Sequence, residues 1–213
     1  MSKLLIAGFA AAALTVAAPA SAAVIFTFTP GAPSPGPGYT VINDFSDATG
    51  IVGANFEIKT PPADANGAPP ANSVPSGTSY LSVLGGGSAT ITFLSAVSGF
   101  QFDWGSIDDY NILTINSTGA DPVIIPGLNF TNPANGNQVS PGTNGLFSVY
   151  GTAGEKFNSI TLTSQTNSFE IDNLATPSSA IPEPATWAMM IVGFGAVGGV
   201  LRSSRRRQTL AYA

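Results

Sequence analysis

The sequence predicts an all-β protein, a jelly-roll-like β-sandwich with a targeting signal at each end of the chain. Between residues 23 and 176, apolar residues occur in short runs that alternate with polar ones, and no stretch has the spacing of an amphipathic helix. The 24 Gly and 17 Pro residues interrupt these runs at short intervals, as in sandwiches with many turns. Continuous apolar runs occur only near the two chain ends.

The first 22 residues predict a secretory signal peptide. Lys3 precedes an apolar run over residues 4–18, and the small residues Ala20 and Ala22 form an A-x-A cleavage site. An uncleaved N-terminal helix is disfavoured because the run is short and ends in that site. We therefore expect export, cleavage after Ala22 by signal peptidase, and a mature protein that begins at Ala23.

Residues 23–176 are expected to form the folded passenger, with about ten short strands. The first three strand candidates are Val24–Thr29, Tyr39–Phe45 and Ile51–Lys59. The proline-rich residues 30–38 can form neither a helix nor a central strand. Residues 60–77 are expected to be a surface loop without chemical function.

The sequence in the middle of the passenger predicts a hairpin followed by a strand rich in aromatic residues. Tyr80–Leu84 and Ala89–Phe93 would be its two strands, joined by a turn at residues 85–87, which are all glycine. Alternation with polar residues then places three aromatic residues on one sheet face, where we expect them to form core: Phe100, Phe102 and Trp104.

The remaining strand candidates complete the sandwich. They are Ile112–Ile115, Val123–Ile125, Leu146–Tyr150, Phe157–Thr163 and Ser168–Leu174. In the last two, apolar residues fall on one face and polar or acidic residues on the other, which is typical of strands with one buried face.

Composition excludes several kinds of function. The chain has no Cys and no His, which removes disulfides, thiol chemistry, imidazole acid-base catalysis and the usual zinc sites. Residues 23–176 contain eleven acidic residues and two lysines, a net charge of −9, which disfavours nucleic acid as a partner. The glutamates lie far apart in the sequence, so we expect no carboxylate pair for glycoside hydrolysis, no catalytic residues and no enzyme activity.

One acidic turn is a candidate metal site. Asp103, Asp108, Asp109 and Asn111 offer the oxygen ligands that Ca²⁺ prefers. The same residue types also form turns by hydrogen bonding to nearby backbone. Because the spacing of a calcium-binding EF-hand loop is absent, we favour the turn-forming role, with no cofactor, and keep Ca²⁺ as the alternative.

A second alternative is carbohydrate binding. Trp104 and Tyr110, with Tyr150, would supply rings on which a sugar stacks. Aromatic residues in strands are more often core than ligand platforms. We therefore expect a structural passenger, with carbohydrate or Ca²⁺ binding as the alternative.

The C-terminal region predicts a membrane anchor behind a linker at residues 177–181. Pro182, Glu183 and Pro184 prevent a helix from running in from the passenger. A transmembrane helix is expected over residues 185–201, with fifteen uncharged residues from Trp187 to Leu201. A basic tail over residues 202–207 would stay in the cytoplasm, and its arginines are Arg202, Arg205, Arg206 and Arg207.

These residues resemble the PEP-CTERM sorting signal in its PEPxxWA variant. The similarity rests on Pro182, Glu183 and Pro184, on Trp187 and Ala188, and on the arginine cluster. It implies that an exosortase, a membrane-embedded cysteine transpeptidase, recognises the Pro-Glu-Pro segment and cuts near it. The chain would be held transiently at the inner membrane and then reach the cell surface or the extracellular matrix of a biofilm.

The passenger is itself similar to a family of exosortase-dependent surface proteins with one β-rich domain. The similar segments are Tyr80–Thr90, Trp104–Asn111 and Phe169–Leu174. This resemblance implies a fold and a location, with exopolysaccharide as a possible partner, and it implies no reaction.

Overall fold

The computed structural model describes residues 23–178, 189–198 and 202 of the 213-residue chain. The chain divides into two compact units, Met1–Thr176 and Pro177–Ala213. Residues 23–176 were expected to form the passenger, and the described part of the first unit covers the same range. In the second unit residues 189–198 are helical, within the span expected to cross the membrane. No helix among the described residues is long and apolar enough to cross a membrane.

Several predicted features lie outside the described residues. These are the signal peptide and its cleavage site at Ala20 and Ala22, the linker from residue 179 onward, and most of the predicted sorting segment. The sorting residues concerned are Pro182, Glu183, Pro184, Trp187, Ala188, Arg205, Arg206 and Arg207.

The first unit contains ten strands and one short 3₁₀ helix among its described residues, in agreement with the all-β prediction. Their bounds are β1 Val24–Pro30, β2 Tyr39–Asn43, β3 Ile51–Lys59, β4 Tyr80–Val97, β5 Gly99–Gly105, β6 Asn111–Ser117, β7 Val123–Pro126, η1 Gly127–Asn129, β8 Gly145–Gly151, β9 Phe157–Ser164 and β10 Phe169–Pro177.

The strands form a jelly-roll sandwich, as predicted. We call β1-β8-β5-β10-β2 the first sheet and β3-β4-β9-β6-β7 the second sheet. The two sheets are joined where residues 169–171 of β10 pair with residues 81–83 of β4. Without β1 and β3, the sheets have the four-strand orders β8-β5-β10-β2 and β4-β9-β6-β7, which is jelly-roll order. Apart from the hairpin β6-β7, consecutive strands from β2 to β10 lie in opposite sheets, with β3 left out.

The predicted hairpin over residues 80–93 is wrong, because β4 is one continuous strand of 18 residues. Ala54 of β3 pairs with Ser88 and Phe56 pairs with Val83, so Asn55 alone faces the four residues 84–87. Gly86, with φ of +72°, lies in this bulge. The bulge is a corner: residues before it pair with the first sheet and residues after it with β9 of the second sheet.

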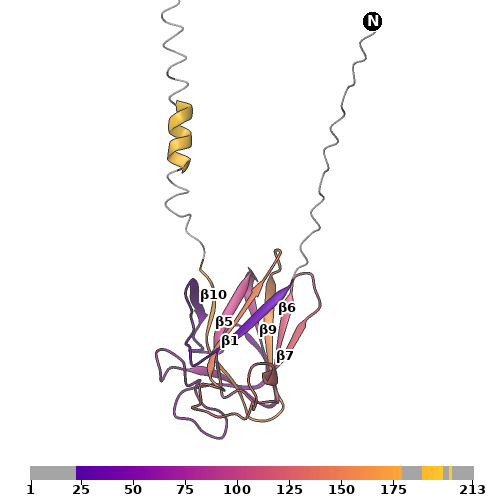
Figure 1. Ribbon diagram of the computed structural model, residues 1–213. Helices are drawn as coiled ribbons and strands as arrows, with labels where there is room; N and C mark the ends of the chain where they lie inside the picture. Colours follow the sequence, from indigo (N-terminus) through magenta and orange to yellow (C-terminus); the bar gives the residue numbers. More distant parts are fainter. Residues whose placement is uncertain (1–22, 179–188, 199–201, 203–213) are drawn as a thin grey trace, which may run out of the picture. The chain divides into compact units, whose positions relative to one another are not determined.

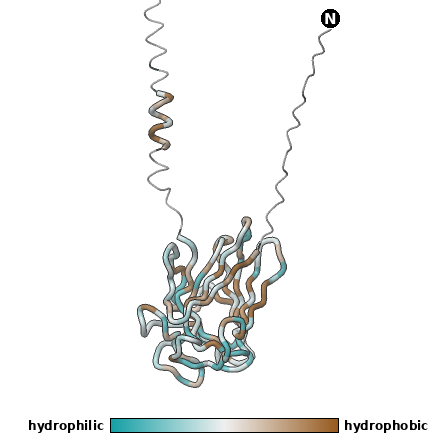
Figure 2. The backbone as a smooth tube through the Cα atoms, in the orientation of Figure 1, coloured by the Kyte–Doolittle hydropathy of each residue, from teal (hydrophilic) through white to brown (hydrophobic). Residues whose placement is uncertain are grey.

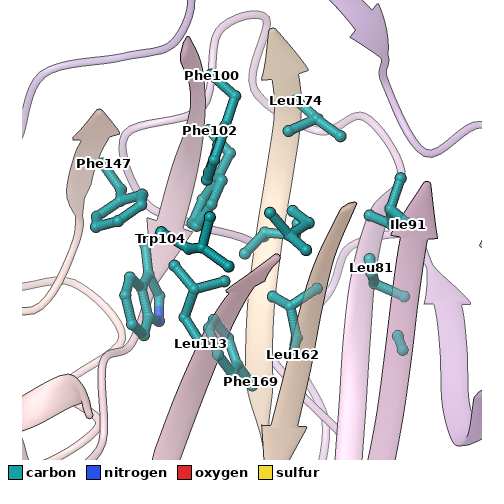
Figure 3. Close-up of a cluster of buried hydrophobic side chains, with 14 of the residues drawn as sticks. Leu81, Ile91, Phe100, Phe102, Trp104, Leu113, Phe147, Leu162, Phe169 and Leu174 are labelled. Atoms are coloured by element: carbon teal, nitrogen blue, oxygen red, sulfur yellow. The ribbon is translucent and has the colours of Figure 1, made fainter. Parts of the chain in front are cut away.

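The core lies between the two sheets and contains the aromatic residues that alternation predicted. Trp104 stacks on Phe169 with ring centroids 4.5 Å apart, and Phe102 lies 4.9 Å from Phe147 (Figure 3). Leu113 and Leu162 of the second sheet are fully buried in the same cluster. Figure 2 shows hydrophobic residues concentrated along the strands and hydrophilic residues in the loops.

The two ends of the sandwich differ. Ala23 bonds to Thr152, and Ala175 pairs with Gln101 near the start of β5, so both ends of this unit lie at one end of the sandwich (Figure 1). The longest loops, residues 60–79 and 130–144, gather at the opposite end. Functional groups on these two loops are therefore far from the points where the chain enters and leaves the sandwich.

Candidate functional site

Three acidic side chains are buried on the outer side of the first sheet. Asp103 of β5 pairs directly with Asp172 of β10, and Glu170 lies two residues before Asp172. They are 0%, 1% and 2% exposed, respectively. Since they alternate with core residues, they point away from the core, and loops from elsewhere in the chain cover them.

The carboxylate of Asp103 holds two loops against the sheet. Its Oδ1 accepts hydrogen bonds from the Ser34 backbone N–H at 2.7 Å and from Asn72 Nδ2 at 2.5 Å. Its Oδ2 accepts from Ser73 Oγ at 3.2 Å and from Asn173 Nδ2 at 2.9 Å. A carboxylate has about four acceptor positions, so these neutral donors occupy the group and leave no room for a metal ion.

Glu170 is held in the same way. Its Oε1 accepts from the Ala68 backbone N–H at 3.3 Å and from the Ser168 hydroxyl, and its Oε2 accepts from Ser106 Oγ at 2.9 Å. Gly67 lies so close that an added Cβ would be 3.0 Å from Oε1, and its φ is +145°. A glycine is therefore required where this loop passes over the carboxylate.

Burial raises the pKa of each of these acids. The pKa of Asp103 rises to about 7, that of Glu170 to about 7 and that of Asp172 to about 6, and in each case desolvation outweighs the hydrogen bonds from neutral donors. The passenger's two lysines do not compensate them: Lys59 pairs with Asp64 at 2.8 Å, and no contact joins Lys156 to these acids. These three carboxyl groups can therefore lose their negative charge by binding protons.

A small polar cavity of about 170 Å³ lies beside Glu170, at the end of the sandwich where the longest loops gather. Its lining includes Asp64, Ser106, Asp108, Tyr110, Asn167 and Glu170. The Tyr110 hydroxyl lies 2.6 Å from Asp108 Oδ2, to which it donates. Burial raises the pKa of Asp108, and burial with that hydrogen bond raises the pKa of Tyr110 to about 12. The cavity can accept hydrogen bonds from a small hydroxylated ligand.

The structure does not bring the four residues predicted as a possible Ca²⁺ site together in one cluster. Asp103 is fully occupied by donors, and Asp109 is exposed. Asn111 Oδ1 accepts from the Asp108 backbone N–H at 2.9 Å, and its Nδ2 donates to the Ser168 carbonyl at 3.0 Å. Asn111 and Asp108 are thus turn-forming residues. Among the described residues, no group of three or more His, Cys, Asp or Glu side chains could hold a metal ion.

The alternative in which Trp104 offers a ring for sugar stacking is wrong, and the expected core position of Trp104 is confirmed. Its side chain is fully buried and packs on Phe169, so neither face is open to a ligand. Tyr110 is half-buried at the polar cavity, and Tyr150 is exposed on β8. The structure does not bring these three residues together.

The loop residues that contact the carboxylates were missed by reasoning from the sequence. Asn72 and Ser73 lie in the loop over residues 60–79, where no chemical function was expected, and Ser34 lies in the proline-rich stretch over residues 30–38. One signal was available: Asp103 alternates with Phe102 and Trp104 in a strand without a cation, so it needed partners from outside that strand.

Comparison with known proteins identifies one segment of the chain. The family model described as the PEP-CTERM protein-sorting motif matches residues 180–207. No curated protein matches the chain.

Two solved structures are similar to part of the chain. CsCBM6-3 from Clostridium stercorarium, solved in complex with cellobiose, is 16% identical, with a TM-score of 0.31, over 66% of this chain and 93% of that one. An exo-β-1,3-galactanase from Phanerochaete chrysosporium, solved with galactose, is 13% identical, with a TM-score of 0.24, over 53% of this chain and 27% of that one. Neither similarity is close enough to indicate a function.

The sorting motif begins four residues after the last residue of the β-sandwich unit. It contains every residue predicted for sorting, from Pro182 through Arg207. The chain therefore carries a PEP-CTERM protein-sorting motif at residues 180–207, C-terminal to a jelly-roll β-sandwich.

Proposed function

We propose that this chain is an exported cell-surface protein whose β-sandwich is a non-catalytic structural passenger. The observation that carries the proposal is the PEP-CTERM motif at residues 180–207. Signal peptidase would remove residues 1–22, and residues 185–201 would hold the chain at the inner membrane. Exosortase would then cut near Pro182-Glu183-Pro184 and deliver the passenger to the cell surface or the extracellular matrix of a biofilm.

The chemistry of the passenger supports a structural role. Asp103 and Glu170 are buried acids with raised pKa values. Their carboxylate oxygens accept hydrogen bonds from loop residues. A catalytic carboxylate needs access to a substrate, and both of these groups are at most 2% exposed. Their role in the proposal is to fasten the loops to the first sheet.

The sorting step is tested by replacing Pro182, Glu183 and Pro184 with alanine in the full chain, expressed in a host that has exosortase. We expect the variant to remain uncut in the membrane fraction, while the wild type is cut near the motif. Mass spectrometry of both termini measures this. The matched control replaces residues 177–179 with alanine, just upstream of the motif. A normal mature mass at the cell surface for the first variant would contradict the proposal.

A carbohydrate-binding passenger is the second candidate, and the polar cavity favours it. Asp108 and Tyr110 line this cavity, and Tyr110 is an aromatic residue that is only half-buried. Calorimetry with monosaccharides, on the full chain, tests this candidate, and a parallel titration with Ca²⁺ tests the metal alternative, which no cluster of described acidic residues favours. Heat on sugar addition that is lost in Asp108→Asn and Tyr110→Phe, and kept in Asp109→Asn, would support carbohydrate binding. The absence of heat with every monosaccharide would exclude it.

A further inference from the structure

The outer face of the second sheet carries aligned rows of hydroxyl side chains. In the central row, Thr90 of β4, Thr161 of β9 and Thr114 of β6 are direct cross-strand partners. In one neighbouring row Thr92 pairs with Ser159. In the other, Thr163 pairs with Ser88 of β4 and with Ile112 of β6. We call these six residues the hydroxyl face: Thr90, Thr92, Thr114, Ser159, Thr161 and Thr163.

The hydroxyl face is held rigidly. The residues that alternate with it, such as Leu113, Ile160 and Leu162, are fully buried in the core. Adjacent strands are about 4.8 Å apart, and β-branched threonines have restricted χ1 angles. Thr90 Oγ1 and Thr161 Oγ1 are 2.8 Å apart, in hydrogen-bond contact. Each hydroxyl has one donor and two acceptor positions, so this contact leaves capacity for a ligand at defined spacing.

This face is uncharged within a strongly acidic unit. Residues 87–97 of β4 and all of β6, β7 and β9 contain no Asp, Glu, Lys or Arg. Residues 51–55 of β3 also lack charge. The eleven acidic residues between residues 23 and 176 therefore all lie elsewhere. A partner recognised here gains nothing from ionic contacts and must be matched by hydroxyl and apolar groups.

The central row ends in apolar residues on both sides. Val52 of β3 pairs with Thr90 and is 75% exposed, and Ile124 of β7 pairs with Thr114 and is 64% exposed. The row thus offers hydrogen-bonding groups at its centre and apolar contact at its ends. A pyranose polymer presents the same combination, since its hydroxyl groups surround a C–H surface.

We propose that the hydroxyl face binds a neutral polysaccharide. The inference rests on the proposed surface location, because an exported passenger meets such polymers outside the cell. An anionic polymer would be repelled by the net charge of −9 over residues 23–176. A second copy of the chain carries the same charge, and approach of two copies is opposed by the same repulsion. A neutral hydroxylated polymer meets no such barrier.

The test uses the full chain, purified in a polyoxyethylene detergent that contains no sugar. Sedimentation with insoluble cellulose, chitin and β-1,3-glucan measures binding, and soluble alginate is the anionic comparison. The variant Thr90→Val/Thr161→Val/Thr114→Val removes the hydroxyls of the central row and keeps side-chain shape. The control Thr27→Val/Thr29→Val makes the same change at exposed positions of β1 in the first sheet.

We expect the wild type and the control to bind at least one neutral polymer equally well, with little dependence on salt. The central-row variant should bind about tenfold less tightly, the loss that one or two net hydrogen bonds would cause. Unchanged thermal unfolding would show that the variant is folded. No binding to any neutral polymer, equal binding by the central-row variant, or a wild-type dimer that this variant abolishes would each overturn the proposal. Because binding is measured on purified protein, a failure of sorting would not mimic any of these results.

Discussion

The two sheets of the sandwich use the same alternation of residues for opposite purposes. In the first sheet the outward positions of β5 and β10 hold Asp103, Glu170 and Asp172, all buried beneath loops. In the second sheet the outward positions hold Thr90, Thr161 and Thr114, which are only half-buried. The difference shows that charge on a sheet face needs partners from distant loops, whereas hydroxyl groups can be left to solvent.

The largest expected effect is a loss of stability as pH rises, and it comes from the first sheet alone. Unfolded Asp and Glu titrate near pH 4, whereas the pKa values of Asp103 and Glu170 are about 7 in the folded protein. The folded state therefore binds more protons between these values, and its stability is full below pH 4 and falls as pH rises through 7. Urea unfolding of the full chain from pH 4 to pH 8 should show a decrease of several kcal/mol. A rise in stability over this range would contradict the pKa assignment.

Removal of the Asp103 side chain is the next largest change. Asp103→Ala leaves four donors without their acceptor in a buried site. We expect a loss of about 3–5 kcal/mol in the free energy of unfolding. Urea titration at pH 8, above the Asp103 pKa of about 7, measures it, with Asp109→Ala, an exposed acid, as the control. A loss below about 1 kcal/mol would mean that the loops do not depend on this carboxylate.

At the corner of β4, where the chain passes from one sheet to the other, substitution of one specific glycine should lower the stability of the fold. A Cβ on Gly87 would lie 2.3 Å from the Asn55 carbonyl oxygen, whereas one on Gly86 would meet no atom within 4 Å. We expect Gly87→Ala to cost about 2–4 kcal/mol. Gly86→Ala should cost about 1–2 kcal/mol, from its positive φ alone. Equal melting temperatures for the two variants would show that the bulge can shift.

The smallest effect is expected on the second sheet. Thr161→Val removes a hydroxyl that is half-exposed to solvent and hydrogen-bonds to Thr90 at 2.8 Å, and it keeps a β-branched side chain. The free energy of unfolding should change by no more than about 0.5 kcal/mol. Calorimetric unfolding provides the measurement. A loss of unfolding free energy as large as that of Asp103→Ala would show that the outward residues of both sheets contribute equally to stability, contrary to the comparison above.

Local patterns in the sequence predicted the strands, the core aromatics and the sorting motif, because each depends on residues close together in the chain. Phe100, Phe102 and Trp104 alternate within one strand, and the motif is a continuous segment. The site could not be predicted in this way. Asp103 bonds to Ser34, 69 residues away, and to Asn72, 31 residues away. Such contacts follow from how the loops close over the sheet and leave no periodicity to detect.

The glycines of β4 illustrate a related limit. A run of three glycines has the same local signature in a hairpin turn and in a bulged strand. The pairing of β3 along both halves of β4 distinguishes the two, and that pairing depends on residues about thirty positions earlier in the chain. Similarly, the aromatic character of Trp104 was evident, but its burial followed from Phe169, on the last strand.

The proximity of the two ends of the sandwich has a consequence for maturation. Ala23 lies beside Thr152, and Thr176 continues from the residue that pairs with Gln101. Under the proposed processing, the new N-terminus at Ala23 and the chain that continues from Thr176 toward the sorting motif would both start from this end of the sandwich. The proposed cuts would then leave the contacts of the loops at the opposite end unchanged, and the sandwich would not need to refold.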